Sequence, residues 1–204
     1  MNKVPGTIPE SFSLGIDLDN WQTCHNFSLA GTISSTEVAV STVPAGTFPS
    51  VKTMDLDAFR RGETGTGMLS PRFANRILMP LKATGRLDAI GEIELEFEKK
   101  RRQLAPDTPS RLSCMWLAED SEAGRSHIGQ MFSTTRRLYV VRVRVFLALA
   151  FRAAHTGWFD QYVEKRDEES IANYWGGLSC PADGWLTTLS KGEYEKELER
   201  RAKR

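Results

Sequence analysis

The feature that most constrains this chain is the stretch from residue 106 to residue 117, PDTPSRLSCMWL. Its two prolines push the residue before each of them out of the helical region, so a charged helical run must end just before this stretch. A short apolar run follows, introduced by Arg111 and Ser113. Arg111 therefore stands where a loop becomes a strand. We expect its side chain to reach into a cleft rather than into a core.

Composition indicates an ordinary soluble globular protein. The chain has 204 residues, a formal net charge of +1, 40% hydrophobic residues and 26% charged residues. These values fit one domain with an extended arm and give no overall attraction to nucleic acid or to an anionic membrane. Three cysteines without a Cys-x-x-Cys pair, and an N-terminus without an apolar leader, indicate a reducing, cytoplasmic setting. We expect no metal site and no membrane span.

The first 69 residues are rich in Pro, Gly, Ser and Thr, and they predict an irregular N-terminal arm packed on a domain of residues 70–204. Within the arm, residues 37–43 alternate like a strand, and residues 54–61 indicate a short helix that Gly62 ends. Three glycines in residues 62–67 resemble a phosphate-binding loop. A flexible loop is the better interpretation, because no Gly-Lys-Ser/Thr follows.

The domain alternates between helical and strand patterns. Helices are predicted from the Ser70-Pro71 cap to Pro80, over residues 87–104, from Asp120 to about Phe132 and from Asp167 to Gly177, and a strand over residues 137–145. Residues 178–187 indicate a loop, and the charged end from Lys191 indicates a polar helix or a fraying tail.

Two groups of cations allow more than one interpretation. The run at residues 99–102, KKRR, is either a solvated helix end or part of a nucleic-acid surface. In the predicted strand, one face is a core face formed by Tyr139, Val141, Val143 and Val145. Arg142 and Arg144 share the other face with Leu138 and Val140, and this face could line a groove. A phosphate-binding stripe across both groups is the least favoured function, given the net charge.

Three features recur in the order of a known family. They are Pro-Ser-Arg-Leu-Ser at residues 109–113, Leu-Tyr-Val-Val-Arg-Val at 138–143, and Ala-Asn-Tyr-Trp-Gly-Gly at 172–177, followed by Trp185. Together they resemble a bacterial and phage family of small ADP-ribosyltransferase-like domains, over roughly residues 85–190. The resemblance implies an α+β fold with a split mixed or antiparallel sheet around a cleft that binds NAD. It also implies NAD-dependent mono-ADP-ribosyltransferase activity on a host macromolecule, protein more than nucleic acid.

The resemblance assigns cofactor-binding positions. Arg111 would bind an NAD phosphate or ribose, Ser113 would hydrogen-bond the ribose or carboxamide, and Tyr174 or Trp175 would form an aromatic wall for the nicotinamide. Two simpler interpretations remain open. In the first, Arg111 forms a surface salt bridge with Asp107 or Glu119, and in the second the aromatic pair only packs in the core.

The catalytic carboxylate is where the chain departs from the family. Related sequences carry a glutamate beside the tryptophan that follows the Tyr-Trp motif, whereas residues 184–188 here read GWLTT. Glu193 is the candidate catalytic acid if the loop is longer in this chain. The alternative is a catalytically degenerate protein on the same scaffold, acting as an inhibitor or adaptor, because function depends on the site and not on the fold.

Overall fold

The structure is a computed structural model. It describes residues 9–19, 32–35, 54–62, 69–70, 77, 80–133, 135–181 and 186–196. The elements in chain order are β1 (Phe12–Asp17), β2 (Thr32–Ser34), α3 (Leu56–Arg60), α5 (Ala89–Leu104), β3 (Met115–Glu119), α6 (Glu122–Met131), β4 (Leu138–His155), α7 (Gly157–Lys165), α8 (Glu168–Gly176) and β5 (Leu186–Lys196). The class is α+β, as predicted.

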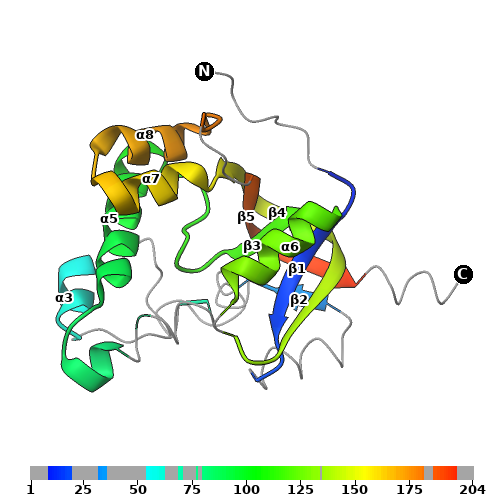
Figure 1. The fold of residues 1–204 in the computed structure, drawn as a ribbon, viewed down its shortest axis with the longest axis horizontal. Coiled ribbons are helices and arrows are strands. Elements are labelled where there is room, and N and C mark those ends of the chain that lie inside the picture. The colour runs from blue at the N-terminus through cyan, green and yellow to red at the C-terminus, as the bar shows by residue number, and fades with distance from the viewer. Residues whose placement is uncertain are drawn as a thin grey trace, which may run out of the picture.

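The strands form one antiparallel sheet in the order β2-β5-β3-β1-β4, and β4 also pairs with β5. The long β4 makes this possible, because its first part pairs with β1 and its remainder with β5. Register shifts between Val145 and Leu147 and between Ala148 and Ala150 bend the strand between these two partners. Strands β5, β3, β1 and β4 therefore close into a ring (Figure 1).

The ring encloses the smaller of two apolar cores, formed by residues that alternate along the strands: Phe12, Leu14, Ile16, Leu117, Val141 and Val143. Helix α6 covers the opposite face, where Gly15 of β1 lies. A Cβ at Gly15 would stand 2.9 Å from a methyl group of Ile128 on α6, so a glycine permits the close approach.

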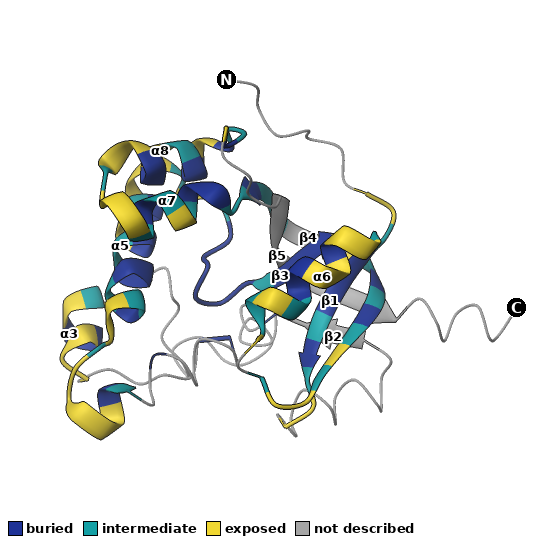
Figure 2. Cartoon of the chain, in the orientation of Figure 1, coloured by how far each residue is buried: buried dark blue, intermediate teal, exposed yellow. Residues whose placement is uncertain are grey.

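The larger core lies in the helical part of the molecule. Helices α5, α7 and α8 pack together, and residues from the loop before β3 and from the far end of β4 join them. Figure 2 shows the consequence: residues 109–114, which lead into β3, are buried although they have no regular secondary structure, whereas Pro106 and Asp107 are exposed. This buried segment belongs to the stretch with which the sequence analysis began.

Several predicted elements are confirmed. Helix α5 matches the predicted helix over residues 87–104, α6 and α8 match the other two, and α3 matches the short helix before Gly62. Their starts follow from capping, because Asp88, Ser121 and Asp167 each accept a hydrogen bond from a backbone N–H one turn into the helix. The predicted strand begins as expected but continues ten residues further, to His155.

Other predictions were wrong. Residues 12–17, assigned to the irregular arm, form β1 between β3 and β4. The charged segment from Lys191 is strand as far as Lys196, because β5 is paired on one side with β4 and on the other with β3 and β2. Pro80 does not end helical structure, since residues 80–84 are helical. The strand predicted over residues 37–43 and the glycine loop after Gly62 lie outside the described residues, and the boundary at residue 69 stays a prediction.

Candidate functional site: a buried arginine centre

The centre is organised by α5, whose glutamates alternate with apolar residues from residue 92 to residue 98. That alternation fits a strand as well as a helix in sequence. In the helix it places Glu94 and Glu98, four residues apart, on one face, and both are buried. Glu98 accepts a hydrogen bond from Ser110 and Glu94 accepts one from Arg111. Two glutamates one helical turn apart therefore hold two consecutive residues of the loop that follows the helix.

Glu98 holds the first of those residues and the end of its own helix. The Ser110 hydroxyl donates to a Glu98 carboxylate oxygen at 2.7 Å. Arg101 forms a two-point pair with the same carboxylate at 2.8 and 2.9 Å, and Arg102 donates to it at 3.1 Å. Arg101 also donates to the carbonyls of Pro106 and Thr108. The loop is thereby fastened to the helix before Arg111 is reached.

Glu94 holds Arg111 in the same manner. Nε and Nη2 of Arg111 donate to the two Glu94 oxygens, both at 2.7 Å, and Nη1 donates to the Tyr174 hydroxyl at 2.6 Å. The guanidinium carbon lies 4.2 Å from the Phe159 ring centre and 4.4 Å from that of Trp116. With 3% of its surface exposed, Arg111 is a core residue that is charged, paired and enclosed by aromatic rings.

The surroundings of Arg111 and Tyr174 favour a charged guanidinium and a neutral phenol. Burial alone would lower the pKa of Arg111, but Glu94 and Tyr174 outweigh it and raise that pKa above its ordinary value. Burial raises the pKa of Tyr174 to about 12, with Arg111 acting against the rise. Arg111 therefore stays cationic and Tyr174 stays neutral at physiological pH.

The Tyr-Trp pair belongs to the same core. Tyr174 and Trp175 are buried, and the Trp175 indole nitrogen donates to the Phe97 carbonyl at 3.0 Å. Tyr174 and Phe97 meet edge to face, with ring centres 5.2 Å apart. Two motifs separated by 63 residues in sequence thus meet in one contact, between Arg111 and Tyr174. In this arrangement neither aromatic ring presents a face to solvent.

The structure brings together four of the five predicted site residues. Arg111, Tyr174 and Trp175 are buried against the middle of α5, at Glu94 and Phe97. Ser113, two residues further along the loop from Arg111, has no exposed surface. Glu193 lies instead in β5, where its backbone is in register with Ser34 of β2 and Leu147 of β4. As placed, the four buried residues offer no accessible surface to a dinucleotide.

Sequence reasoning missed the partner of Arg111. A surface salt bridge to Asp107 or Glu119 was the simpler alternative, yet the acid is Glu94 and the pair is buried. The signal was present, because glutamates four apart on a helix precede a Ser-Arg pair that must fold back over it. This signal was overlooked because an arginine between a loop and a strand was expected to face a cleft.

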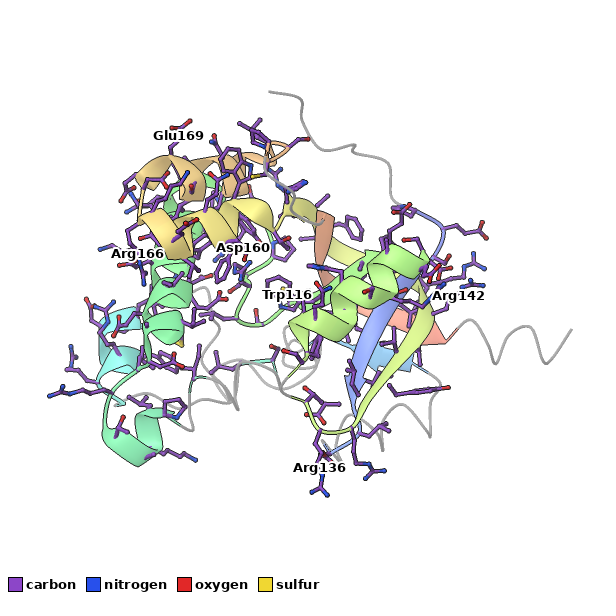
Figure 3. All side chains as sticks on the ribbon, viewed as in Figure 1. Trp116, Arg136, Arg142, Asp160, Arg166 and Glu169 are labelled. Carbon is purple, nitrogen blue, oxygen red and sulfur yellow. The ribbon has the colours of Figure 1, made fainter. Side chains whose placement is uncertain are left out.

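Asp160 on α7 was also missed. Burial raises the pKa of its carboxyl group, and the positive charge of Arg111 acts in the opposite direction. Figure 3 shows Asp160 on the side of α7 that faces the loop leading to Trp116. Asp160 is exposed as a whole residue, but its carboxyl group is partly enclosed by the protein on the side near Arg111, and this partial enclosure raises its pKa.

The two groups of cations are mostly neutralised by carboxylates. In the run 99–102, Lys100 pairs with Glu168, and both arginines pair with Glu98. The expectation of a solvated helix end was therefore wrong for Arg101, which is buried. On β4, Arg142 pairs with Asp120, which also receives Arg125 at 3.1 Å and the Ser11 hydroxyl at 2.9 Å. Carboxylates therefore engage four of the six cations in these two groups, Lys100, Arg101, Arg102 and Arg142.

Comparison with known proteins places the fold in a family. The scaffold is an α+β domain in which a closed antiparallel sheet adjoins a helical core with a buried arginine. Residues 77–195, more than half of the chain, match the family described as a protein of unknown function, DUF2441, and the chain belongs to that family. None of the curated proteins compared matches the chain.

The other two expectations concerned metal sites and membrane spans. Among the described residues, no cluster of three or more His, Cys, Asp or Glu side chains is arranged to hold a metal ion. No helix in the described part of the chain combines the length and the apolar character needed to cross a bilayer.

Proposed function

We propose that this chain is a non-catalytic binding protein built on a scaffold that resembles ADP-ribosyltransferases. The observation that supports the proposal best is that the Arg111 guanidinium already donates hydrogen bonds to groups of its own protein. A guanidinium that served an NAD phosphate would need donors directed at the ligand. Here Nε and Nη2 of Arg111 donate to the Glu94 carboxylate, and Nη1 donates to the Tyr174 hydroxyl.

Energetics support the same proposal. To reach a phosphate, Arg111 would have to leave Glu94 as a buried, unpaired carboxylate. Breaking a buried ion pair in this way costs about 3–5 kcal/mol. A ligand would have to supply that free energy before any net binding. The missing acid beside Trp185 in the sequence is consistent with a scaffold that has lost the chemical step.

A protein partner fits the surface better than a nucleic acid does. The cations of α5 and β4 that could track a phosphate backbone are largely paired with carboxylates, as described above. Counterion release, which drives nucleic-acid binding, needs cations that are available to phosphates. The chain is therefore proposed to act as an adaptor or inhibitor of a host protein.

An NAD-dependent ADP-ribosyltransferase is the second proposal. The contact between Arg111 and Tyr174 favours it, because the two motifs that the family resemblance assigns to one NAD site do meet in space. It requires Glu193 to act as the catalytic acid and requires Arg111 to be released when NAD binds.

One experiment separates the two proposals. Purified full-length chain is incubated with NAD labelled in the adenylate group and with host lysate, and both free nicotinamide and macromolecular label are measured. The binding proposal expects neither product. Transfer that is abolished in Glu193→Gln and retained in Glu195→Gln, its neighbour on β5, would establish the enzyme and refute the binding proposal.

The binding arm of the experiment keeps the whole chain. Removing residues 1–69 would delete β1 from between β3 and β4, so loss of binding after that deletion would report unfolding. The better variant replaces the charge pair by apolar residues, Glu94→Leu with Arg111→Met, because such exchanges are often close to neutral for stability. The binding proposal expects this variant to keep its protein partner, and loss of the partner from a folded variant would contradict it.

A further inference from the structure

Two arginines from different elements converge on one carboxylate just before α6 begins. Arg125 of α6 donates to one oxygen of Asp120 at 3.1 Å, and Arg142 of β4 contacts the other oxygen through its Nε. The Ser11 hydroxyl also donates to this second oxygen, at 2.9 Å. Both oxygens of Asp120 therefore have donors, and only 10% of its side-chain surface is exposed. We call Ser11, Asp120, Arg125 and Arg142 the Asp120 cluster.

The Asp120 cluster carries more positive than negative charge, because two guanidiniums share a single carboxylate. Within the part of the chain that the structure describes, no other carboxylate forms an ion pair with Arg125 or Arg142. Glu122, in the first turn of α6, is the next acid along the chain, and it pairs with neither arginine. The cluster is therefore a local cationic point on a chain that is close to neutral overall.

Both arginines remain accessible to a second molecule. Their side chains keep 48% of their surface exposed for Arg125 and 35% for Arg142. Arg125 contacts Asp120 through Nη1 and Arg142 through Nε, so each guanidinium has further N–H groups that no described residue accepts. Figure 3 shows Arg142 beside α6, at the outside of the molecule. These donors differ from those of Arg111, which are enclosed in a core.

We propose that Arg125 and Arg142 form a docking site for a carboxylate in an acidic segment of a partner protein. The inference rests on the proposed binding function and adds the chemistry of the partner. The two oxygens of a carboxylate accept one hydrogen bond from each guanidinium, and such charge-assisted bonds are about twice as strong as neutral ones. Asp120 holds both arginines in place before binding, so less side-chain freedom is lost when the partner docks.

The charge of the site favours a protein segment over a nucleic acid. Binding to a phosphate backbone is driven by several cations that each release a counterion. The Asp120 cluster has only one positive charge in excess of its carboxylate, which matches a single acidic side chain and not a row of phosphates.

The test is a nitrogen-15 NMR titration of the full chain with the end-blocked peptide Gly-Glu-Gly-Glu-Gly, with Gly-Gln-Gly-Gln-Gly as the uncharged control. Saturable shifts of the Arg125 and Arg142 Nε–H signals are expected with the acidic peptide alone. Arg125→Gln should weaken the binding by about fivefold, the upper end of what an exposed ion pair contributes. Arg136→Gln is the matched control and should leave the affinity unchanged. It removes the same charge from an exposed arginine that Figure 3 shows well away from Arg142.

Arg142→Lys provides an independent variant on β4 if Arg125→Gln does not fold. It keeps a positive charge beside Asp120 but removes the planar guanidinium, so peptide binding should weaken while Tm changes little. Peptide binding that is as tight in folded Arg125→Gln and Arg142→Lys as in the unaltered chain would overturn the proposal.

The proposal is also overturned if Arg136→Gln weakens peptide binding as much as Arg125→Gln, or if the uncharged peptide binds equally well. Tighter binding of an oligothymidylate at the same two arginine signals would assign the site to nucleic acid instead. The NAD experiment tests the proposed function separately. Transfer of label would refute that function whatever the peptide does, whereas absence of peptide docking would refute only the site.

Discussion

Replacing Glu94 by glutamine should destabilise this protein more than any comparable change at a surface charge. The substitution keeps the size of the side chain but removes the negative charge that faces Arg111. Both groups are buried, with 3% and 4% of their side-chain surfaces exposed. Arg111 cannot relieve the loss by giving up its proton, because arginine stays protonated in proteins. Removing one partner of a buried pair costs about 3–5 kcal/mol.

The same helix offers a matched control. Glu92 stands two residues earlier on α5 and pairs with Arg60 at 2.8 Å, but both side chains are substantially exposed, at 39% and 44%. A solvent-exposed pair contributes about 0–1 kcal/mol. Glu92→Gln should therefore change the free energy of unfolding by less than 1 kcal/mol, roughly. The difference between the two variants isolates the effect of burial from the chemistry of the substitution.

The measurement is urea denaturation followed by far-ultraviolet circular dichroism and tryptophan fluorescence. The total stability of a domain is about 5–15 kcal/mol, so Glu94→Gln should still fold and show a clearly lower midpoint. The double variant Glu94→Leu with Arg111→Met completes a cycle with the two single changes, and it should be far less destabilised than their sum. A cost below about 1 kcal/mol for Glu94→Gln, or simple additivity in the cycle, would refute the structural role assigned to the pair.

Two further predictions concern helices α6 and α7. Gly124→Ala should destabilise by about 1–3 kcal/mol, because its Cβ would stand 2.0 Å from the Glu119 carbonyl oxygen. Gly129→Ala on the same helix meets no atom within 4 Å and should stabilise by up to about 1 kcal/mol; thermal melts that rank the two variants the other way would contradict the packing. Burial raises the pKa of Asp160, although the positive charge of Arg111 opposes the rise. Above the pKa that Asp160 has in the folded chain, its ionised form therefore lowers the stability. This penalty disappears below the pKa of about 4 that the group has in the unfolded chain. Asp160→Asn should therefore be more stable than the unaltered chain at pH 7 and equal to it at low pH in urea titrations, and a difference that grows as the pH falls would be the opposite sign.

Much of the secondary structure could be predicted because its signals are local. Capping residues mark the starts of α5, α6 and α8, and Gly177 marks the end of α8. Strand β1 had a local signal too, since Phe12, Leu14 and Ile16 alternate. The surrounding Pro, Gly, Ser and Thr residues outweighed it in the sequence interpretation. Strand β5 had no comparable signal, because its charged residues form strand only through pairing with neighbours on both sides.

The candidate site shows the same division. Arg111, Tyr174 and Trp175 stand out in the sequence because they belong to the two motifs at residues 109–113 and 172–177. Their chemical state depends on contacts across 17 and 63 residues. No local pattern specifies whether such an arginine faces a ligand or a glutamate.

The sequence by itself determined four helices, α3, α5, α6 and α8, where they begin, and that the charged helical run ends before Pro106 and Pro109. These follow from backbone sterics and capping, which act over a few residues. Only the tertiary structure decided that β1 enters the sheet, that β4 and β5 close it, and that Arg111 is enclosed with Glu94. Burial, strand pairing and charge neutralisation are long-range properties, because they depend on which distant residues share a core.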